Sequence, residues 1–267
     1  MQTRTLLIDG HVHLYPYYDF NKAVRTGINN LVRAFKHVDG NDSTKIWLLT
    51  ERWDCDFFKQ IYERPESFST SKIRFVPAKE KEALAVEIEG QVELFILAGR
   101  QIVSHEGLEV LSLATDLFVK DRTLSTREVI EKVNETGGVA ALNWAPGKWF
   151  FKRGKIVQQI FKEMEPATLL IGDTSLRHWL WPMPELMKSA RQHGFKVIAG
   201  SDPLPFAGEE KYIGSYGFII NGNFDPEAPV TSIRKLLKDN QLSVTFIGKR
   251  NNPFTFAYRE FRIMRTK

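Results

Sequence analysis

Cysteine and long apolar runs are the features that this sequence lacks most. Its 267 residues include one cysteine, Cys55, which excludes an internal disulfide framework and fits a reducing compartment. No apolar run approaches the roughly 20 residues that a membrane span needs, and no basic-then-apolar leader opens the chain. These absences predict a cytoplasmic protein without a membrane partner. We expect Cys55 to be a packed thiol rather than a nucleophile.

The remaining composition is typical of a globular protein. Hydrophobic residues make up 43% and charged residues 26%, so the chain can bury a substantial core. Short apolar runs alternate with amphipathic stretches, and residues 72–114 suggest several strands rather than a helix. No repeat, low-complexity tract or linker divides the chain. We therefore predict one domain over residues 1–267.

The clearest local pattern is a series of strand and helix segments in the second half of the chain. A capping box from Ser125 to Glu128 begins a predicted helix, and strands are predicted at 139–142, 168–171 and 195–199. Such alternation favours a parallel α/β sheet, with enough units for a closed barrel. In such barrels the functional side chains gather at the carboxyl ends of the strands.

Two histidines follow the first predicted strand, residues 6–8, in the pattern Asp9-Gly-His11-Val-His13. Side chains at i and i+2 of an extended segment point the same way, so both imidazoles can face one ion. Asp9 is placed to orient a ring or to add a further ligand. Asp202 follows the predicted strand 195–199 and can complete a His-His-Asp site. The alternative is a turn with two exposed histidines.

Other polar side chains also follow predicted strands and are expected to line a pocket. They are Glu51, Arg52, Gln101, His105, Asn143 and His178. Convergent polar groups of this kind are what a binding pocket requires. A structural role is the alternative for each: Asn143 could cap a loop, and His178, beside Trp179, could be a packed ring.

The order of these segments resembles the PHP family, the polymerase-and-histidinol-phosphatase domain. Residues 9–13 resemble its first motif, residues 137–141 resemble the segment entering its Ala-His-Pro motif, and residues 200–202 resemble its Gly-Ser-Asp-x-His motif. The resemblance covers residues 5–215. It implies a distorted seven-stranded (β/α)7-type barrel, and hydrolysis of phosphoester bonds with up to three metal ions.

Four positions depart from the family pattern. Glu51 and Arg52 stand where Asp-His is usual, Gln101 replaces a metal-binding glutamate, the histidine before Pro146 is absent, and Leu204 replaces the last histidine. The resemblance then implies a reduced site with at most one divalent ion, zinc, manganese or iron, on His11, His13 and Asp202. Glu51 would be the base and Arg52 the anchor of a small anionic substrate. Alternatively Arg52 pairs with Asp202 or Glu51 and replaces a lost ion electrostatically.

Three functional hypotheses follow. The leading one is a PHP-like metal-dependent hydrolase, resembling a phosphoesterase, with this reduced site. The second is a catalytically inactive PHP-like barrel that serves as a binding or regulatory module. The third is a C–N or ester hydrolase resembling the amidohydrolase superfamily, which needs two further histidines, for which His105 and His178 are the candidates.

The C-terminal segment, residues 231–267, is strongly basic. It contains nine lysines and arginines against Asp239 and Glu260. Such a surface could meet nucleic acid, but it has no recognised nucleic-acid motif, so we expect a solvated basic edge packed on the domain. Its aromatics at 254, 256, 258 and 261 are interpreted as a half-buried strand. The sequence does not indicate an oligomeric state.

Overall fold

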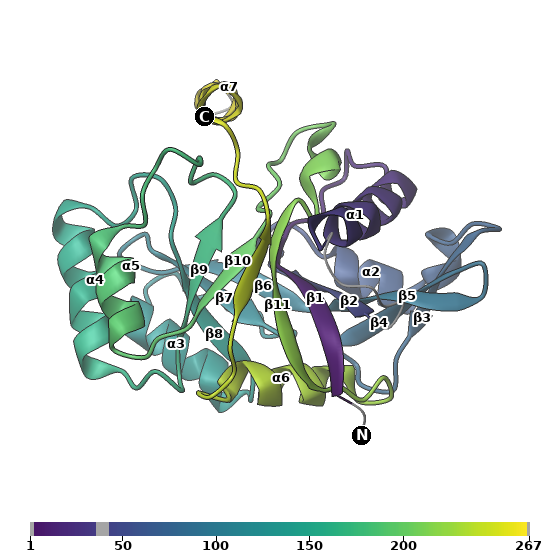
Figure 1. Cartoon of the computed structure of the whole chain (residues 1–267), viewed down its shortest axis with the longest axis horizontal. Coiled ribbons are helices and arrows are strands. Elements are labelled where there is room, and N and C mark those ends of the chain that lie inside the picture. Colours follow the sequence, from purple (N-terminus) through teal and green to yellow (C-terminus); the bar gives the residue numbers. More distant parts are fainter. Residues whose placement is uncertain (1–2, 36–42, 266–267) are drawn as a thin grey trace.

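The computed structural model describes residues 3–35 and 43–265, so the last two residues of the basic segment lie outside the described part. Twelve strands form two open mixed sheets (Figure 1). The seven-stranded sheet has the order β12 (Thr245–Gly248), β11 (Tyr216–Asn223), β1 (Thr3–Val12), β2 (Ser43–Leu49), β5 (Gln91–Leu97), β4 (Ala83–Ile88) and β3 (Ile73–Pro77). The five-stranded sheet has the order β10 (Val197–Gly200), β9 (Leu170–Thr174), β8 (Val139–Asn143), β7 (Glu109–Leu113) and β6 (Gly99–Val103).

The helices cover the outer sides of the two sheets and the two ends of the molecule (Figure 1). They are α1 (Phe20–Ala34), α2 (Phe57–Glu63), α3 (Thr126–Glu135), α4 (Phe151–Glu163), α5 (Glu185–Gln192), α6 (Pro229–Lys238) and α7 (Pro253–Met264), with 3₁₀ turns at Pro65–Ser67 (η1) and Glu209–Tyr212 (η2). The predicted capping box is confirmed, because Ser125 and Glu128 bond reciprocally at the start of α3. None of the helices in the described ranges is both long enough and apolar enough to cross a membrane.

The prediction of a closed barrel is wrong for the described chain. β1 pairs with β11 on one edge and with β2 on the other, so it has no free edge with which β10 could pair. β2 pairs in turn with β5, and only an isolated bridge between Glu51 and Arg100 joins it to β6. The middle of the chain also forms antiparallel hairpins, β3–β4–β5 and β6–β7, in place of strand-helix units.

Both sheets are buried on their two faces. Leu6 and Ile8 of β1 lie in a core cluster with Ala141 of β8 and Ile198 of β10, so this cluster joins the two sheets. Leu7, on the opposite face of β1, belongs to a second cluster that includes residues of α1 and α2. A third cluster lies between the five-stranded sheet and the helices α3, α4 and α5. Because side chains alternate along β1, the strand contributes residues to both of the first two core clusters.

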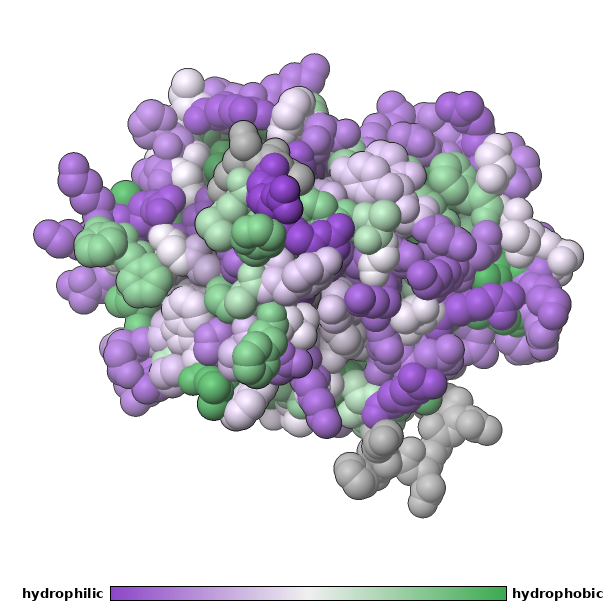
Figure 2. Space-filling model, turned by 90° about the horizontal axis from the view of Figure 1, so that it is seen from above, coloured by the Kyte–Doolittle hydropathy of each residue, from purple (hydrophilic) through white to green (hydrophobic). Residues whose placement is uncertain are grey.

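The basic C-terminal segment contributes α6, β12 and α7. The interpretation of residues 254–261 as a strand is wrong: Asn252 caps the helix α7, and Pro253 occupies its first turn. Arg259 is 0% exposed and is therefore not part of a solvated edge. The outward side of α7 carries exposed apolar side chains, and Figure 2, which looks onto this end of the molecule, shows hydrophobic patches among hydrophilic residues.

Candidate metal centre

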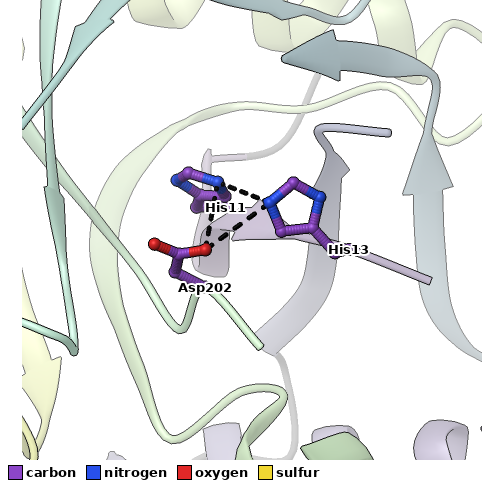
Figure 3. Close-up of side chains that lie close together, drawn as sticks. All are labelled: His11, His13 and Asp202. Atoms are coloured by element: carbon purple, nitrogen blue, oxygen red, sulfur yellow. Dashed lines mark hydrogen bonds and ion pairs between the residues drawn. The ribbon is translucent and has the colours of Figure 1, made fainter. Parts of the chain in front are cut away.

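The structure brings His11, His13 and Asp202 together, as the sequence predicts. The two Nε2 atoms lie 3.0 Å apart, and each lies 3.5 Å from Oδ1 of Asp202. Figure 3 shows the three polar ends converging on one point. All three residues are buried: the exposed fraction of the surface is 2% for His11, 3% for His13 and 8% for Asp202. Among the described residues this is the one group of three or more potential ligands close enough to hold a metal ion.

Two glycines allow the strands that carry this cluster to approach each other. A Cβ at Gly10 would lie 2.8 Å from the carbonyl oxygen of Ala199. A Cβ at Gly200 would lie 2.8 Å from Cα of His11 and closer still to its Cβ and N. Neither strand could carry a side chain here. The backbone N–H of Asp202 donates to the carbonyl of His11 over 2.9 Å and fixes the register of the two segments.

Asp9 fixes the backbone around the cluster and does not contact an imidazole ring. Its Oδ1 accepts from the N–H groups of His11, at 3.2 Å, and Ser201, at 2.9 Å. Its Oδ2 accepts from Oγ of Ser201, at 2.5 Å, and from the N–H of Gly214, at 2.7 Å. Burial outweighs these bonds and raises the pKa of Asp9 to about 6. Asp9 therefore joins β1 to the segments that follow β10 and η2.

The electrostatics of the cluster favour the ligand forms of His11 and Asp202. Burial lowers the pKa of His11, so its ring is neutral at neutral pH. Burial opposes ionisation of Asp202, but the attraction to His11 and the hydrogen bond and charge of His13 outweigh it, and the pKa is lowered to about 2. Divalent metals bind neutral imidazoles and ionised carboxylates.

The three side chains fit a divalent ion in geometry and in chemistry. Ligands bound at about 2.0–2.1 Å in a tetrahedron lie roughly 3.3 Å apart, close to the observed edges of 3.0 and 3.5 Å. Two imidazoles and one carboxylate suit zinc, iron or manganese. Oε1 of Gln101 lies 3.1 Å from Nε2 of His11 and brings a further oxygen to the same point. The cluster could hold one ion; its identity is not determined.

Glu51 lies at the start of α2. Its Oε1 accepts from the N–H groups of Phe57, at 2.6 Å, and Phe58, at 3.1 Å, where the helix has unpaired donors. Burial raises the pKa of Glu51 to about 7, although the charge of Arg100 and the two hydrogen bonds act against burial. No hydrogen bond or ion pair joins Glu51 to the three-residue cluster in the described structure.

We expect Glu51→Gln to flatten the dependence of stability on pH. The pKa in the folded state lies above the ordinary 4.5, so folding takes up a proton, and the stability that Glu51 contributes is present below about pH 4.5 and lost as the pH rises through 7. Glutamine can accept the same two backbone bonds but does not titrate. The free energy of unfolding of the wild type should therefore fall by about 3 kcal/mol more than that of the variant between pH 4.5 and 8, since one pKa unit is roughly 1.4 kcal/mol.

Urea unfolding at both pH values measures this difference. Exposed Glu185→Gln is the control, and equal pH slopes for wild type and Glu51→Gln would contradict the prediction.

Arg52 forms an ion pair with neither Asp202 nor Glu51. Its guanidinium forms a two-bond pair with Asp54, with distances of 3.0 and 2.8 Å, and both partners are partly exposed. The alternative in which Arg52 pairs with Asp202 or Glu51 is therefore not the arrangement in the structure. Arg52 also lies 6.0 Å from the ring of Tyr15, which stacks on His13.

The other predicted pocket residues are dispersed. His105 is exposed. His178 packs its ring against Trp181 and Phe256, which is the packed ring that we gave as the alternative to a pocket residue. Asn143 is fully buried and donates to Glu109 over 3.1 Å. Of the six residues predicted to line a pocket, only Gln101 contacts the His-His-Asp cluster directly.

A large cavity of about 710 Å³ lies next to Glu51 but does not reach the three clustered residues. Its lining carries charges of both signs: the basic side chains Lys59, Lys81, Arg100 and Lys120, and the acidic side chains Glu51, Asp54, Asp56, Glu63 and Asp116. The cluster itself opens to solvent chiefly through Asp202. The cavity and the cluster are therefore neighbouring features rather than one pocket.

Sequence analysis missed two residues of the site. Tyr15 stacks on His13 with ring centroids 5.6 Å apart, and it continues the i, i+2 spacing of the two histidines, which could have revealed it. Arg259 donates to the carbonyl of Asp202 over 3.0 Å. It was counted in the basic segment, and nothing in the local sequence distinguishes it from the neighbouring arginines.

Comparison with known proteins supports the fold and leaves the activity open. No protein-family model matches the chain, and no curated protein does. PsfC from Pseudomonas syringae PB-5123 superposes with a TM-score of 0.55 over 92% of each chain, at 14% identity. The chain has a PsfC-like fold. A two-domain protein from Bacteroides vulgatus ATCC 8482, described as containing a predicted PHP-like metal-dependent phosphoesterase, matches 92% of this chain and 65% of its own length at 14% identity, with a TM-score of 0.46.

Proposed function

We propose that this protein is a PHP-like metal-dependent hydrolase that acts on a small anionic substrate, such as a phosphoester, at a single divalent ion. The observation that carries the proposal is the convergence of His11, His13 and Asp202 on one buried point. Two imidazoles and one carboxylate would leave coordination positions of the ion open for water and substrate.

The roles of the surrounding residues follow from their chemistry. When bound, the ion would polarise a substrate oxygen and lower the pKa of a bound water. Glu51 is the candidate base, since burial holds its pKa near neutrality. Arg52 is the candidate anchor for an anion, because Tyr15 connects it to His13. The net charge of +5 favours an anionic substrate.

The two other hypotheses have less support in the structure. The inactive-module hypothesis, which the four departures from the family pattern motivate, has Arg52 neutralise Asp202, but Arg52 pairs with Asp54. The amidohydrolase hypothesis needs two more histidines at the ion. The exposed His105 and the packed His178 do not belong to the cluster of described residues.

We expect protein purified without chelator to contain up to one zinc, manganese or iron per chain, and to hydrolyse a generic phosphoester such as p-nitrophenyl phosphate. His11→Ala, His13→Ala and Asp202→Ala should each lower metal affinity by more than roughly 100-fold, because losing a ligand costs more than losing an outer contact. Elemental analysis and metal titration measure this, with exposed His105→Ala as the control.

Two results would count against the proposal. Absence of metal together with absence of turnover, when zinc, manganese and iron are each supplied, would reject it. Stoichiometric metal without turnover across a phosphoester and carboxyl-ester panel would retain the metal centre and reject the hydrolase.

A further inference from the structure

We propose that the C-terminal helix α7 is part of the candidate metal centre, because Arg259 holds the backbone of Asp202 in the conformation that aims its carboxylate at His11 and His13. This inference rests on the proposed metal site and assigns a positioning residue to it. Arg259 does not touch the converging ligand atoms; it contacts the main chain of one ligand.

Arg259 is completely buried and makes several specific contacts. Its Nη2 donates to the carbonyl oxygen of Asp202 over 3.0 Å and pairs with Oε2 of Glu209 over 2.6 Å. Its Nη1 lies 3.4 Å from Oγ of Ser175, and its guanidinium carbon lies 4.5 Å from the ring centroid of Tyr212. Because Glu209 balances the charge, the guanidinium can remain buried and ionised. The planar fork lets one side chain reach these partners at once, which a lysine cannot do.

The backbone of Asp202 needs such support. Its φ of +49° lies in the left-handed region, which is unfavourable for a non-glycine residue. Residues persist in that region when their surroundings fix them. The N–H of Asp202 is held by the carbonyl of His11 over 2.9 Å, and its own carbonyl is held by Arg259. The two bonds fix the peptide groups on both sides of the ligand side chain.

The position of α7 suits this role. Figure 1 places the helix at one end of the molecule, outside the layers of the two sheets. Its inner side contacts the loops that follow β9 and β10: Phe256 packs against His178 and Trp181, and Ile263 packs on the small cluster Leu176, Leu204 and Phe206. The guanidinium therefore reaches the metal centre from a helix that contributes little to the main cores.

The test compares two buried arginines. Arg177 is also buried and forms a two-bond pair with Asp173, but in the described structure no hydrogen bond or ion pair joins it to His11, His13 or Asp202. Zinc affinity is measured by competition with a chelator, and the stability of the metal-free protein by urea unfolding, for Arg259→Lys, Arg259→Met and Arg177→Lys. We expect both Arg259 variants to bind zinc roughly 10–100-fold more weakly, as loss of an outer support does in metal sites. Arg177→Lys should lose stability and keep zinc affinity within about twofold.

A second readout separates this inference from the proposed function. The imidazole resonances of His11 and His13 in metal-free protein, assigned with the two alanine variants, should shift in Arg259→Lys and stay unchanged in Arg177→Lys. Unchanged resonances with unchanged zinc affinity would overturn the positioning role, whatever the loss of stability. A wild type that binds no zinc, manganese or iron would reject the metal site, while shifted resonances would still support positioning of the three side chains.

Discussion

Gly200→Ala is expected to cost about 3 kcal/mol of stability and to abolish metal binding. The added methyl group would overlap with Cβ and N of His11, and these atoms belong to the fully buried end of β1. Neither backbone can move without breaking ladder bonds, so the two segments must separate, and overpacking of this kind costs roughly 1–3 kcal/mol or more. The separation would also carry Asp202 away from His11 and His13.

Urea unfolding and zinc titration of the purified variant measure the two effects. Gly147→Ala is the matched control, because Gly147 has the same substitution, open space around it and a φ of +74°. Its cost should be about 1–2 kcal/mol, from the backbone conformation alone, with metal binding retained. Equal stability losses in the two variants, with metal binding intact in both, would show that the close approach of β1 and β10 is not needed.

Asp9→Ala is expected to cost at least about 3 kcal/mol. The change leaves the buried N–H groups of His11, Ser201 and Gly214 without the acceptor that they share, and each unpaired buried group costs about 1–3 kcal/mol. Asp9→Asn retains one acceptor oxygen and should lose less, which keeps the measurement possible if the alanine variant does not fold. Urea midpoints compare both with Asp121→Ala, whose carboxylate accepts from exposed Thr123 and should cost less than about 1 kcal/mol. Similar midpoints for the alanine variants would contradict a bracing role for Asp9.

The His-His-Asp cluster could be predicted because its geometry follows from local periodicity. Alternation along a strand places His11 and His13 on one side, and the apolar run before Gly200 places Asp202 at a strand end. The sheet arrangement could not be predicted in the same way. Which strand occupies the second edge of β1 depends on β11, more than 200 residues away in the sequence, whose pairing with β1 is antiparallel. The PHP resemblance implied a closed barrel. The order of the motifs does not reveal that β11 pairs with the free edge of β1, or that β5 pairs with the free edge of β2, and closure would need these edges.

The roles of single polar residues were the least predictable. Arg52, Arg177 and Arg259 differ in the structure far more than in the sequence: one is partly exposed beside Asp54, one is buried against Asp173, and one reaches Asp202. A spacing of 57 residues separates Arg259 from Asp202, and no local pattern connects them. The aromatic spacing of residues 254–261 also fits a helix, and the capping residue Asn252 with Pro253 favoured the helix over the strand that we predicted.

The candidate ligands come from both sheets, and this has a consequence for the whole chain. His11 and His13 belong to β1 and the residues just after it, whereas Asp202 follows β10 of the other sheet. An ion bound by all three would act as a reversible cross-link that closes a loop containing most of the polypeptide, and the unfolded chain forms such a loop only at a large cost in entropy. Binding to the native state alone would stabilise the entire molecule in proportion to the logarithm of the free ion concentration. Metal supply would thereby govern how firmly the two halves of the protein hold together.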